Sequence, residues 1–221
     1  LIGLCQTAAF QGLEQWALVS GGAGHVALLA YTMPFWAVLL AWAILRERPT
    51  GRHWLGVALA ALGLVCIIEP WRGLGNAAST LLAIAGGVAW AAGTVLSKRL
   101  FRLHAVSALN LTAWQMLAGG VALGIVALAV PQRSIEWSGA FVAGLAYSVL
   151  MASSLAWWLW SIVLRRLPTT LASVGSLGVP IVGVLLAWAI LREEPRPMEW
   201  AGIGFVLLGL CAVSGVRLRR R

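Results

Sequence analysis

The ten-residue run VLLAWAILRE occurs twice in this chain, at Val38–Glu47 and again at Val184–Glu193. The copies are 146 residues apart, and the same offset matches residues on either side of them. The further pairs are Pro34 with Pro180, Pro49 with Pro195, Trp54 with Trp200, Gly56 with Gly202, and Leu62-Gly63-Leu64 with Leu208-Gly209-Leu210. A match of this extent indicates an internal repeat.

The composition around this repeat is that of a membrane protein. Of 221 residues, 61% are hydrophobic and 10% are charged, whereas soluble proteins have about 45–50% apolar and about 25% charged residues. A water-soluble core of this size cannot hide so much apolar surface. Disorder is excluded as well, because disordered chains have low hydrophobicity. We therefore expect an all-α polytopic membrane protein.

Charged residues divide the chain into eight apolar segments. They cover residues 1–19, 23–45, 52–69, 77–97, 105–130, 138–164, 168–191 and 198–216. The segments are continuous rather than alternating in polarity, and most are close to the thickness of a bilayer core. This pattern predicts eight transmembrane helices and no barrel strands.

The basic residues alternate between the two sides of these segments. Twelve lie on one side: Arg46, Arg48, Arg52, Lys98, Arg99, Arg102, Arg165, Arg166, Arg217, Arg219, Arg220 and Arg221. Four lie on the other: Arg72, Arg133, Arg192 and Arg196. The positive-inside rule places the richer side, with the C-terminus, in the cytoplasm. The net charge of +9 is thus explained by orientation in the membrane, and we expect no nucleic-acid partner.

The two copies of the repeat run through the membrane in opposite directions, because the second and seventh segments are five spans apart. An inverted repeat of five helices underlies many secondary transporters. The later copy has five segments and the earlier only three, and residue 1 aligns with Tyr147 inside the sixth segment. We therefore expect a ten-helix parent of which the first two helices are missing. The expected units are residues 1–69, a linker at 70–76, a complete repeat at 77–216 and a basic tail at 217–221.

The matched stretches Pro34–Ile68 and Pro180–Val213 carry a proline-containing span, an apolar run, an Arg-Glu loop and a glycine-rich closing span. This arrangement resembles the EamA repeat of the drug/metabolite transporter superfamily, with Glu47 and Glu193 in the Arg-Glu loop. The resemblance implies an exporter of a metabolite or drug in the inner (plasma) membrane, with both termini cytoplasmic. The missing helices depart from the family pattern. The alternative is a truncated membrane protein that does not transport and acts as a scaffold or remnant.

Glu14 is the one acidic residue well inside a predicted span. Gln11 and Gln15 accompany it in the same helix. A carboxylate in the membrane is costly and faces a cavity or a partner, so these residues are candidates for proton coupling or for binding a substrate amine. The alternative is an interfacial position, because Glu14 lies only about 9 Å from the helix end near Ser20 at 1.5 Å per residue.

Pro34 and Pro180 stand within spans at matched positions of the repeat. A proline inside a helix removes a backbone hydrogen bond and produces a kink. Interrupted helices at equivalent positions of two halves are typical of transport sites. We expect both prolines to act as hinges or to shape the cavity, although membrane helices also tolerate prolines without any such role.

Tryptophans within the spans are the other candidates for substrate contact, namely Trp90, Trp114, Trp157 and Trp160. The repeat aligns Gln11 with Trp157 and Glu14 with Trp160, so one half offers a polar face and the other an aromatic face. Such a site would suit an amphipathic solute with a charged head, for example an aromatic amino acid. Tyr31 adds a polar group within a span. The alternative is that these side chains pack against helices or lipid.

No nucleophile–base pair, metal-ligand cluster or phosphate loop is recognisable in the sequence. We therefore expect no enzyme activity, no catalytic residue, no cofactor and no metal. The expected partners are a small-molecule substrate and the lipid bilayer, with protons and a second copy of the chain as further candidates. The motif Gly120-x-x-x-Gly124 predicts close packing between helices.

Overall fold

The computed structural model describes residues 1–21, 26, 29–72, 76–131, 136–186, 188–189 and 196–214. Within these residues the fold is helical, and each of the eight predicted segments contains helix. Five described helices are long and apolar enough to cross a membrane: Ala77–Leu103, Ala108–Ala129, Gly139–Arg166, Thr169–Leu186 and Pro197–Ser214. Met33–Leu45 and Gly51–Ile67 are shorter apolar helices. The predicted all-α polytopic fold is confirmed.

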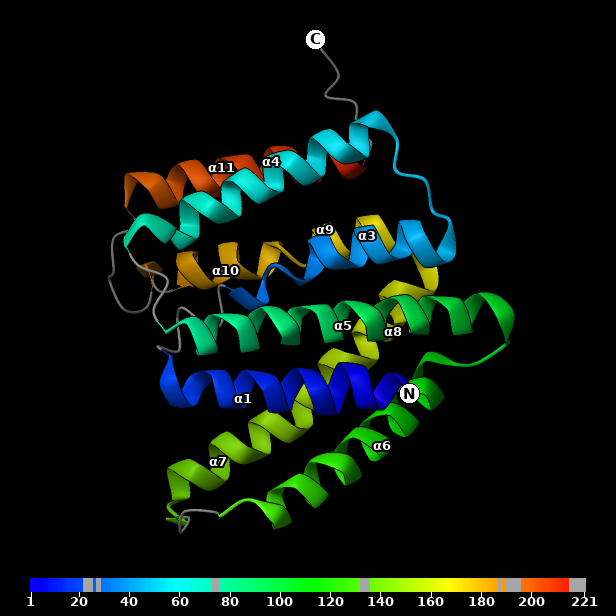
Figure 1. Cartoon of the computed structure of the whole chain (residues 1–221), viewed down its shortest axis with the longest axis vertical. Helices are drawn as coiled ribbons and strands as arrows, with labels where there is room; N and C mark the ends of the chain where they lie inside the picture. Colours follow the sequence, from blue (N-terminus) through cyan, green and yellow to red (C-terminus); the bar gives the residue numbers. More distant parts are fainter. Residues whose placement is uncertain are drawn as a thin grey trace.

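The helices follow one another with short connections (Figure 1). In chain order they are η1 (Leu4–Ala9), α1 (Phe10–Ser20), α3 (Met33–Leu45), α4 (Gly51–Ile68), η2 (Pro70–Arg72), α5 (Ala77–Leu103), α6 (Ala108–Ala129), α7 (Gly139–Tyr147), η3 (Ser148–Leu155), α8 (Ala156–Arg166), α9 (Thr169–Gly175), α10 (Gly178–Leu186) and α11 (Pro197–Ser214). Polar residues begin several of them: Asn76, Ser107 and Ser138 each accept a hydrogen bond from a backbone N–H of the first turn. These caps satisfy donors that have no partner inside the helix.

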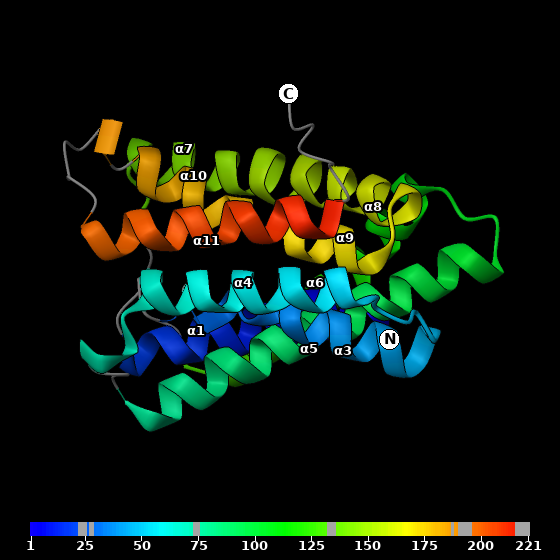
Figure 2. The ribbon, with the colours of Figure 1, turned by 90° about the horizontal axis from the view of Figure 1, so that it is seen from above.

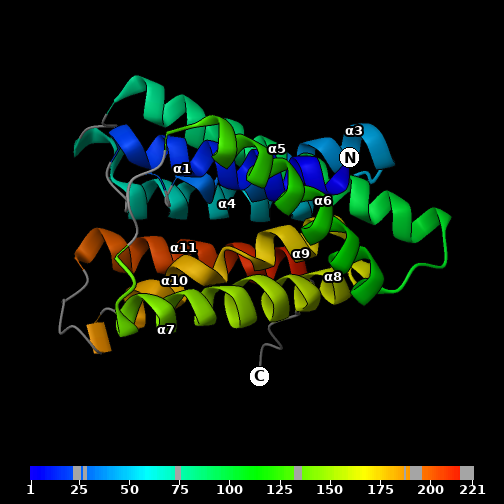
Figure 3. The same cartoon turned by 90° about the horizontal axis from the view of Figure 1, so that it is seen from below.

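Two layers make up the molecule. Figures 2 and 3 show α1, α3, α4 and α5 on one side and α7 to α11 on the other. Helices α7 and η3 expose apolar side chains along almost their whole length. Such a surface is typical of a protein that lies in hydrocarbon rather than in water.

Helices α4 and α11 pack antiparallel as a pair related by the repeat (Figure 1). Their bounds, Gly51–Ile68 and Pro197–Ser214, coincide under the 146-residue offset. The contacts are reciprocal: a Cβ built on Gly56 would lie 2.7 Å from the carbonyl oxygen of Gly209, and one on Gly202 would lie 2.7 Å from that of Gly63. Each contact is the repeat image of the other, so the pair has the local two-fold symmetry that an inverted repeat requires.

The repeated aromatic residues also adopt matched geometry. Trp42 and Trp54 meet edge to face with ring centroids 6.0 Å apart and planes at 85°. Their repeat mates, Trp188 and Trp200, do so at 5.6 Å and 85°. Edge-to-face packing is a preferred arrangement of aromatic pairs. These tryptophans therefore belong to the scaffold of each repeat.

The predicted second and seventh spans are interrupted at equivalent places. A turn at residues 31–32 precedes α3, and another at 176–177 separates α9 from α10. Pro34 and Pro180 lie in the first turn of the helix that follows each break. A first-turn N–H has no intrahelical acceptor, so proline is accommodated there without losing a hydrogen bond. The expected kink inside a continuous helix is therefore corrected to a break one turn before each proline.

The glycine motif of α6 does not pack as expected. A Cβ built on Gly120 or Gly124 would meet no heavy atom of the described chain within 4 Å. The prediction of close packing at this motif was wrong within the described residues. Close approach instead occurs at the repeated glycines of α4 and α11, where side chains would separate the helices.

Helix α5 is longer than the predicted segment 77–97 and ends at Leu103. Lys98, expected in a loop, is buried with 8% of its surface exposed. Its Nζ donates hydrogen bonds to the carbonyl oxygens of Leu164 at 2.7 Å and Leu167 at 2.5 Å. These carbonyls end α8, where free acceptors and the helix dipole favour a cation. This satisfies the ammonium group and lets α5 continue past it.

Candidate functional site

Two adjoining cavities share part of their linings, and the second lies between the layers. The first, of about 320 Å³, is lined by Phe10, Glu14, Leu18, Val26, Ala30, Tyr31 and Met33. The second, of about 450 Å³, is lined by Phe10, Tyr31, Met33, Trp90, Ala152, Ala156, Trp157, Trp160, Ser176 and Val179. Phe10, Tyr31 and Met33 belong to both linings and form the boundary between a compartment with a carboxylate and one with three tryptophans.

Helix α1 supplies one wall through residues spaced by four. Phe10, Glu14 and Leu18 therefore stand on the same side of the helix and line the first cavity. Glu14 is half-buried. A Cβ on Gly86 of α5 would lie 3.6 Å from its Cγ, an ordinary van der Waals distance, so the glutamate stem packs beside α5.

The second cavity has an aromatic wall. The rings of Trp90 in α5 and Trp160 in α8 pack in a tilted arrangement, with centroids 5.0 Å apart and planes at 36°. Trp90 is buried with 6% of its surface exposed. The indole Nε1 of Trp160 is buried and has no hydrogen-bond partner in the described part of the chain. Such a donor is costly to bury unless a ligand or water pairs with it.

Matched positions of the two repeats contribute to the linings. The 146-residue offset relates Phe10 to Ala156, Glu14 to Trp160, Ala30 to Ser176 and Met33 to Val179, and all eight residues line one or both cavities. The second cavity therefore lies where the repeats meet, and the first, lined by the earlier repeat, adjoins it. The two sides differ in chemistry, since the carboxylate of one half is matched by an indole in the other.

The structure brings together five of the predicted site residues: Glu14, Tyr31, Trp90, Trp157 and Trp160. Gln11 is half-buried and lines neither cavity. Gln15 lies on another side of α1, in a groove against α6 with Leu123 and Val126.

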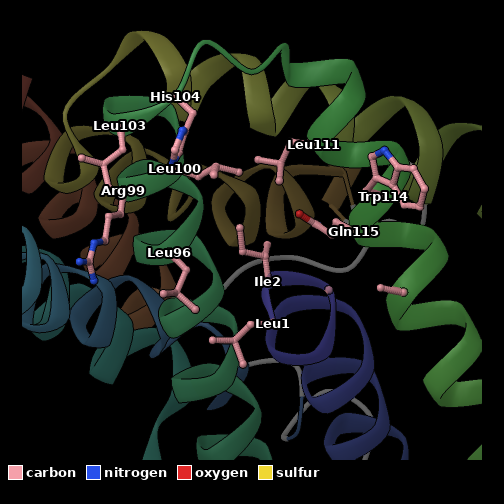
Figure 4. Close-up of a pocket in the computed structure, with 12 residues that line it drawn as sticks. Leu1, Ile2, Leu96, Arg99, Leu100, Leu103, His104, Leu111, Trp114 and Gln115 are labelled. Carbon is pink, nitrogen blue, oxygen red and sulfur yellow. The ribbon is translucent and has the colours of Figure 1, made fainter.

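Trp114 lies in a separate pocket of about 480 Å³ between α5 and α6 (Figure 4). Leu1, Ile2, Arg99 and Gln115 share this pocket. Trp114 is therefore not part of the shared cavity between the repeats.

A charged cluster ties the repeats together at the end of the molecule where α5 ends. Arg102 donates to the carboxylate of Glu47, and Thr169 donates to the same carboxylate oxygen at 3.2 Å. Lys98 is close enough to Glu47 for an electrostatic interaction. We call Glu47, Lys98, Arg102 and Thr169 the Glu47 cluster. Its repeat counterpart Glu193 lies outside the described residues.

A second ion pair joins the repeats where α4 ends and α11 begins. Figure 1 shows these helix ends on the opposite side of the molecule from the end of α5. Arg196, just before α11, donates from its guanidinium to Glu69 Oε2 at 2.6 Å. Glu69 ends α4 in the left-handed backbone region with φ 48°. The described repeats are thus linked by charge at both ends, with the cavities between them.

Sequence reasoning did not identify Phe10, Met33, Ser176 and Val179 as lining residues. Helical spacing from Glu14 points to Phe10, four residues earlier, and the repeat offset relates Met33 to Val179. Lys98 was missed because its charge suggested a loop. Within the described residues no group of three or more His, Cys, Asp or Glu side chains is placed to hold a metal ion. The lining groups are suited to noncovalent binding.

Comparison with known proteins finds relatives that are described as membrane transporters. Over 208 residues the chain is 26% identical to a probable amino-acid metabolite efflux pump of Salmonella typhimurium, covering 90% of this chain and 70% of that protein. It is 24% identical over 193 residues to the uncharacterized inner membrane transporter YedA of Escherichia coli, covering 86% of this chain and 61% of YedA. A solved crystal structure superposes with a TM-score of 0.83 at 21% identity, covering 97% of this chain and 75% of the other.

The family comparison covers nearly the whole chain. The model of the EamA-like transporter family matches residues 1–69 and 78–215. The two relatives named above are described as a probable efflux pump and an inner membrane transporter. The chain therefore belongs to the EamA-like transporter family.

Proposed function

We propose that this transporter exports a small metabolite or drug across the inner membrane, and that the two adjoining cavities hold the solute. The observation that carries the proposal is the pair of linings built from repeat-matched positions, with Glu14 on one side and Trp160 on the other. In inverted-repeat transporters the substrate site lies between the repeats near the bilayer midplane. The combined volume of the two cavities is in the range of small-molecule binding sites.

Alternating access is the proposed mechanism. The breaks before Pro34 and Pro180 offer places where each repeat can bend, and hinge motions use few residues at element ends. Opening at the end with the Glu47 cluster requires Arg102 and Thr169 to release Glu47. Opening at the other end requires Arg196 to release Glu69. Each state then keeps one of the two charged links.

The orientation follows from the loop charges. The Glu47 cluster lies at the end that carries twelve of the sixteen Lys and Arg residues of the sequence, so the positive-inside rule makes it cytoplasmic. Glu14 stands nearer the other, external end, close to the end of α1. The C-terminus is then cytoplasmic, and Glu47 closes the cytoplasmic path to the cavities.

The test is solute flux in proteoliposomes that contain the full chain. We expect saturable movement of at least one member of a labelled panel of amino acids, amines and cationic drugs, above the rate in empty vesicles. Flux should fall in Trp160→Ala and remain in Trp158→Ala, since Trp158 lines neither cavity. Absence of flux for the whole panel would instead support a membrane protein that does not transport.

A further inference from the structure

The described lining of the two cavities contains one carboxylate and no basic side chain. Glu14 is the carboxylate, Tyr31 and Ser176 supply hydroxyl groups, and the remaining lining side chains are apolar or aromatic. No Lys, Arg or His is among these described residues. Among the described lining residues, a bound solute therefore finds a partner for a positive charge but none for a negative one.

Two described cations of α5, the helix that carries Trp90, are engaged elsewhere. Lys98 donates to the two carbonyl oxygens that end α8, and Arg102 donates to Glu47. Removing either cation to serve the cavity would leave a buried carbonyl pair or carboxylate without its partner, which is costly. These bases are committed to the scaffold.

The second compartment favours a flat apolar body. Trp157 and the packed pair of Trp90 and Trp160 line it, and indole faces attract both aromatic rings and cations. Tyr31 and Phe10 lie at the boundary with the carboxylate compartment. A solute with an amine at one end and an aryl group at the other would occupy both compartments at once.

Building on the proposed function, we infer that the substrate class is an aromatic amine cation without a carboxylate, rather than a zwitterionic amino acid. The ammonium group pairs with Glu14 and the aryl group lies against Trp157 and Trp160. An α-carboxylate would lie beside Glu14 without a cationic partner among the described lining residues, and a like charge at short range opposes binding. The amphipathic solute expected from the sequence is thereby restricted to one that carries a positive charge and no negative charge.

The experiment measures binding to the full chain in lipid nanodiscs by displacement of radiolabelled phenethylamine. The competitors are phenethylamine, phenylalanine, phenylalanine methyl ester and 3-phenylpropionate, which vary the charges on one aryl body. We expect phenethylamine and the ester to bind at least about tenfold more tightly than phenylalanine, a difference of about 1.4 kcal/mol. 3-Phenylpropionate should not compete.

Variants separate charge recognition from folding. Glu14→Gln keeps the side-chain shape and should weaken phenethylamine binding at least about tenfold, whereas Glu14→Asp should retain the preference for the amine. Gln15→Ala is the matched control, since Gln15 faces α6 rather than the cavities. Circular dichroism and gel filtration are the controls that test whether each variant is folded.

Three results would overturn the inference: equal affinity for phenylalanine and its ester, an unchanged amine affinity in Glu14→Gln, or no binding of any probe to folded protein. Each is distinct from failure of the proposed function. Saturable flux of phenylalanine without a preference for amines would contradict the inferred substrate class but support the proposed transport function. Binding of amines without flux of any panel member would support the inferred ligand class but contradict the proposed transport function.

Discussion

At the scale of single residues, Lys98 has the least ordinary environment of the described basic side chains. It lies in the long apolar helix α5, is buried, and donates to two carbonyl oxygens at the end of α8. Hydrogen bonds that involve a charged group contribute more to stability than neutral ones. The ammonium group thus fixes the end of α8 against α5 and stabilises the contact between these helices.

Lys98→Met should lower the free energy of unfolding by about 1.5–3 kcal/mol, because two helix-terminal carbonyls lose a charged donor. The measurement is reversible unfolding in mixed micelles with increasing sodium dodecyl sulfate. Arg99→Met is the matched control, since Arg99 is exposed. Equal unfolding midpoints for the two variants would show that the Lys98 contacts contribute nothing to stability.

At the scale of helices, the α4–α11 pair depends on the absence of side chains at four glycines. A Cβ on Gly63 would lie 2.6 Å from the carbonyl oxygen of Gly202 and 2.7 Å from Cγ2 of Val206. Backbone cannot yield as a flexible side chain can, so the helices must separate. Small residues allow membrane helices to approach this closely.

Gly63→Ala should therefore destabilise the protein by about 1–3 kcal/mol, the usual cost of overpacking a tight contact. Gly120→Ala is the control, since its Cβ would meet no described atom within 4 Å. That change should be neutral or stabilise by up to about 1 kcal/mol, since alanine favours helix. The same detergent titration measures both, and similar losses in the two variants would contradict the proposed packing.

The interrupted helices make a separate prediction. In a continuous helix, a proline cannot donate to the carbonyl four residues earlier, and its ring clashes with that carbonyl. Pro34 and Pro180, in the first turns of α3 and α10, therefore oppose the extension of these helices through the preceding turns. In Pro180→Ala the break between α9 and α10 can close. We expect a lower transport rate with substrate affinity nearly unchanged, measured by flux and by equilibrium binding. A normal rate in the Pro34→Ala, Pro180→Ala double variant would rule out a hinge role.

At the scale of the whole molecule, the two charged links at opposite ends govern which path to the cavities is open. Glu47→Gln removes the charge that Arg102 and Thr169 contact, so it should favour opening at that end. In a cysteine-free chain with Ser176→Cys, a cavity position, cytoplasmic maleimide should then react faster. Glu136→Gln is the control, at an exposed residue. Unchanged labelling would show that the Glu47 cluster does not restrict access.

The loop charges predict the orientation of the molecule. A fluorescent protein fused after Arg221 should mature and fluoresce, because the positive-inside rule places the C-terminus in the cytoplasm. Alkaline phosphatase at the same position should be inactive, because it needs the oxidising external compartment. The opposite pair of results would reverse the orientation and exchange the cytoplasmic and external roles of Glu47 and Glu69.

The sequence by itself determined the fold class and the repeat. Continuous apolar runs predict membrane helices, and an identical run after an odd number of spans requires opposite orientations. Pairs such as Trp42 with Trp54, and their repeat mates, then fold alike because their local sequences are alike. These features depend on length, hydropathy and chain order, all of which can be read along the chain.

Only the tertiary structure decided which face of each helix meets which neighbour. In a span where almost every residue is apolar, no polar stripe marks the buried side. For this reason, the sequence could not show that Glu14 faces a cavity while Gln15 faces α6. Nor could it show that the tight helix contact lies at Gly63 and not at Gly120. Lys98 shows the same limit for charge, since burial depends on carbonyls 66 and 69 residues away. Such partners are brought together by packing between helices, which local sequence does not record.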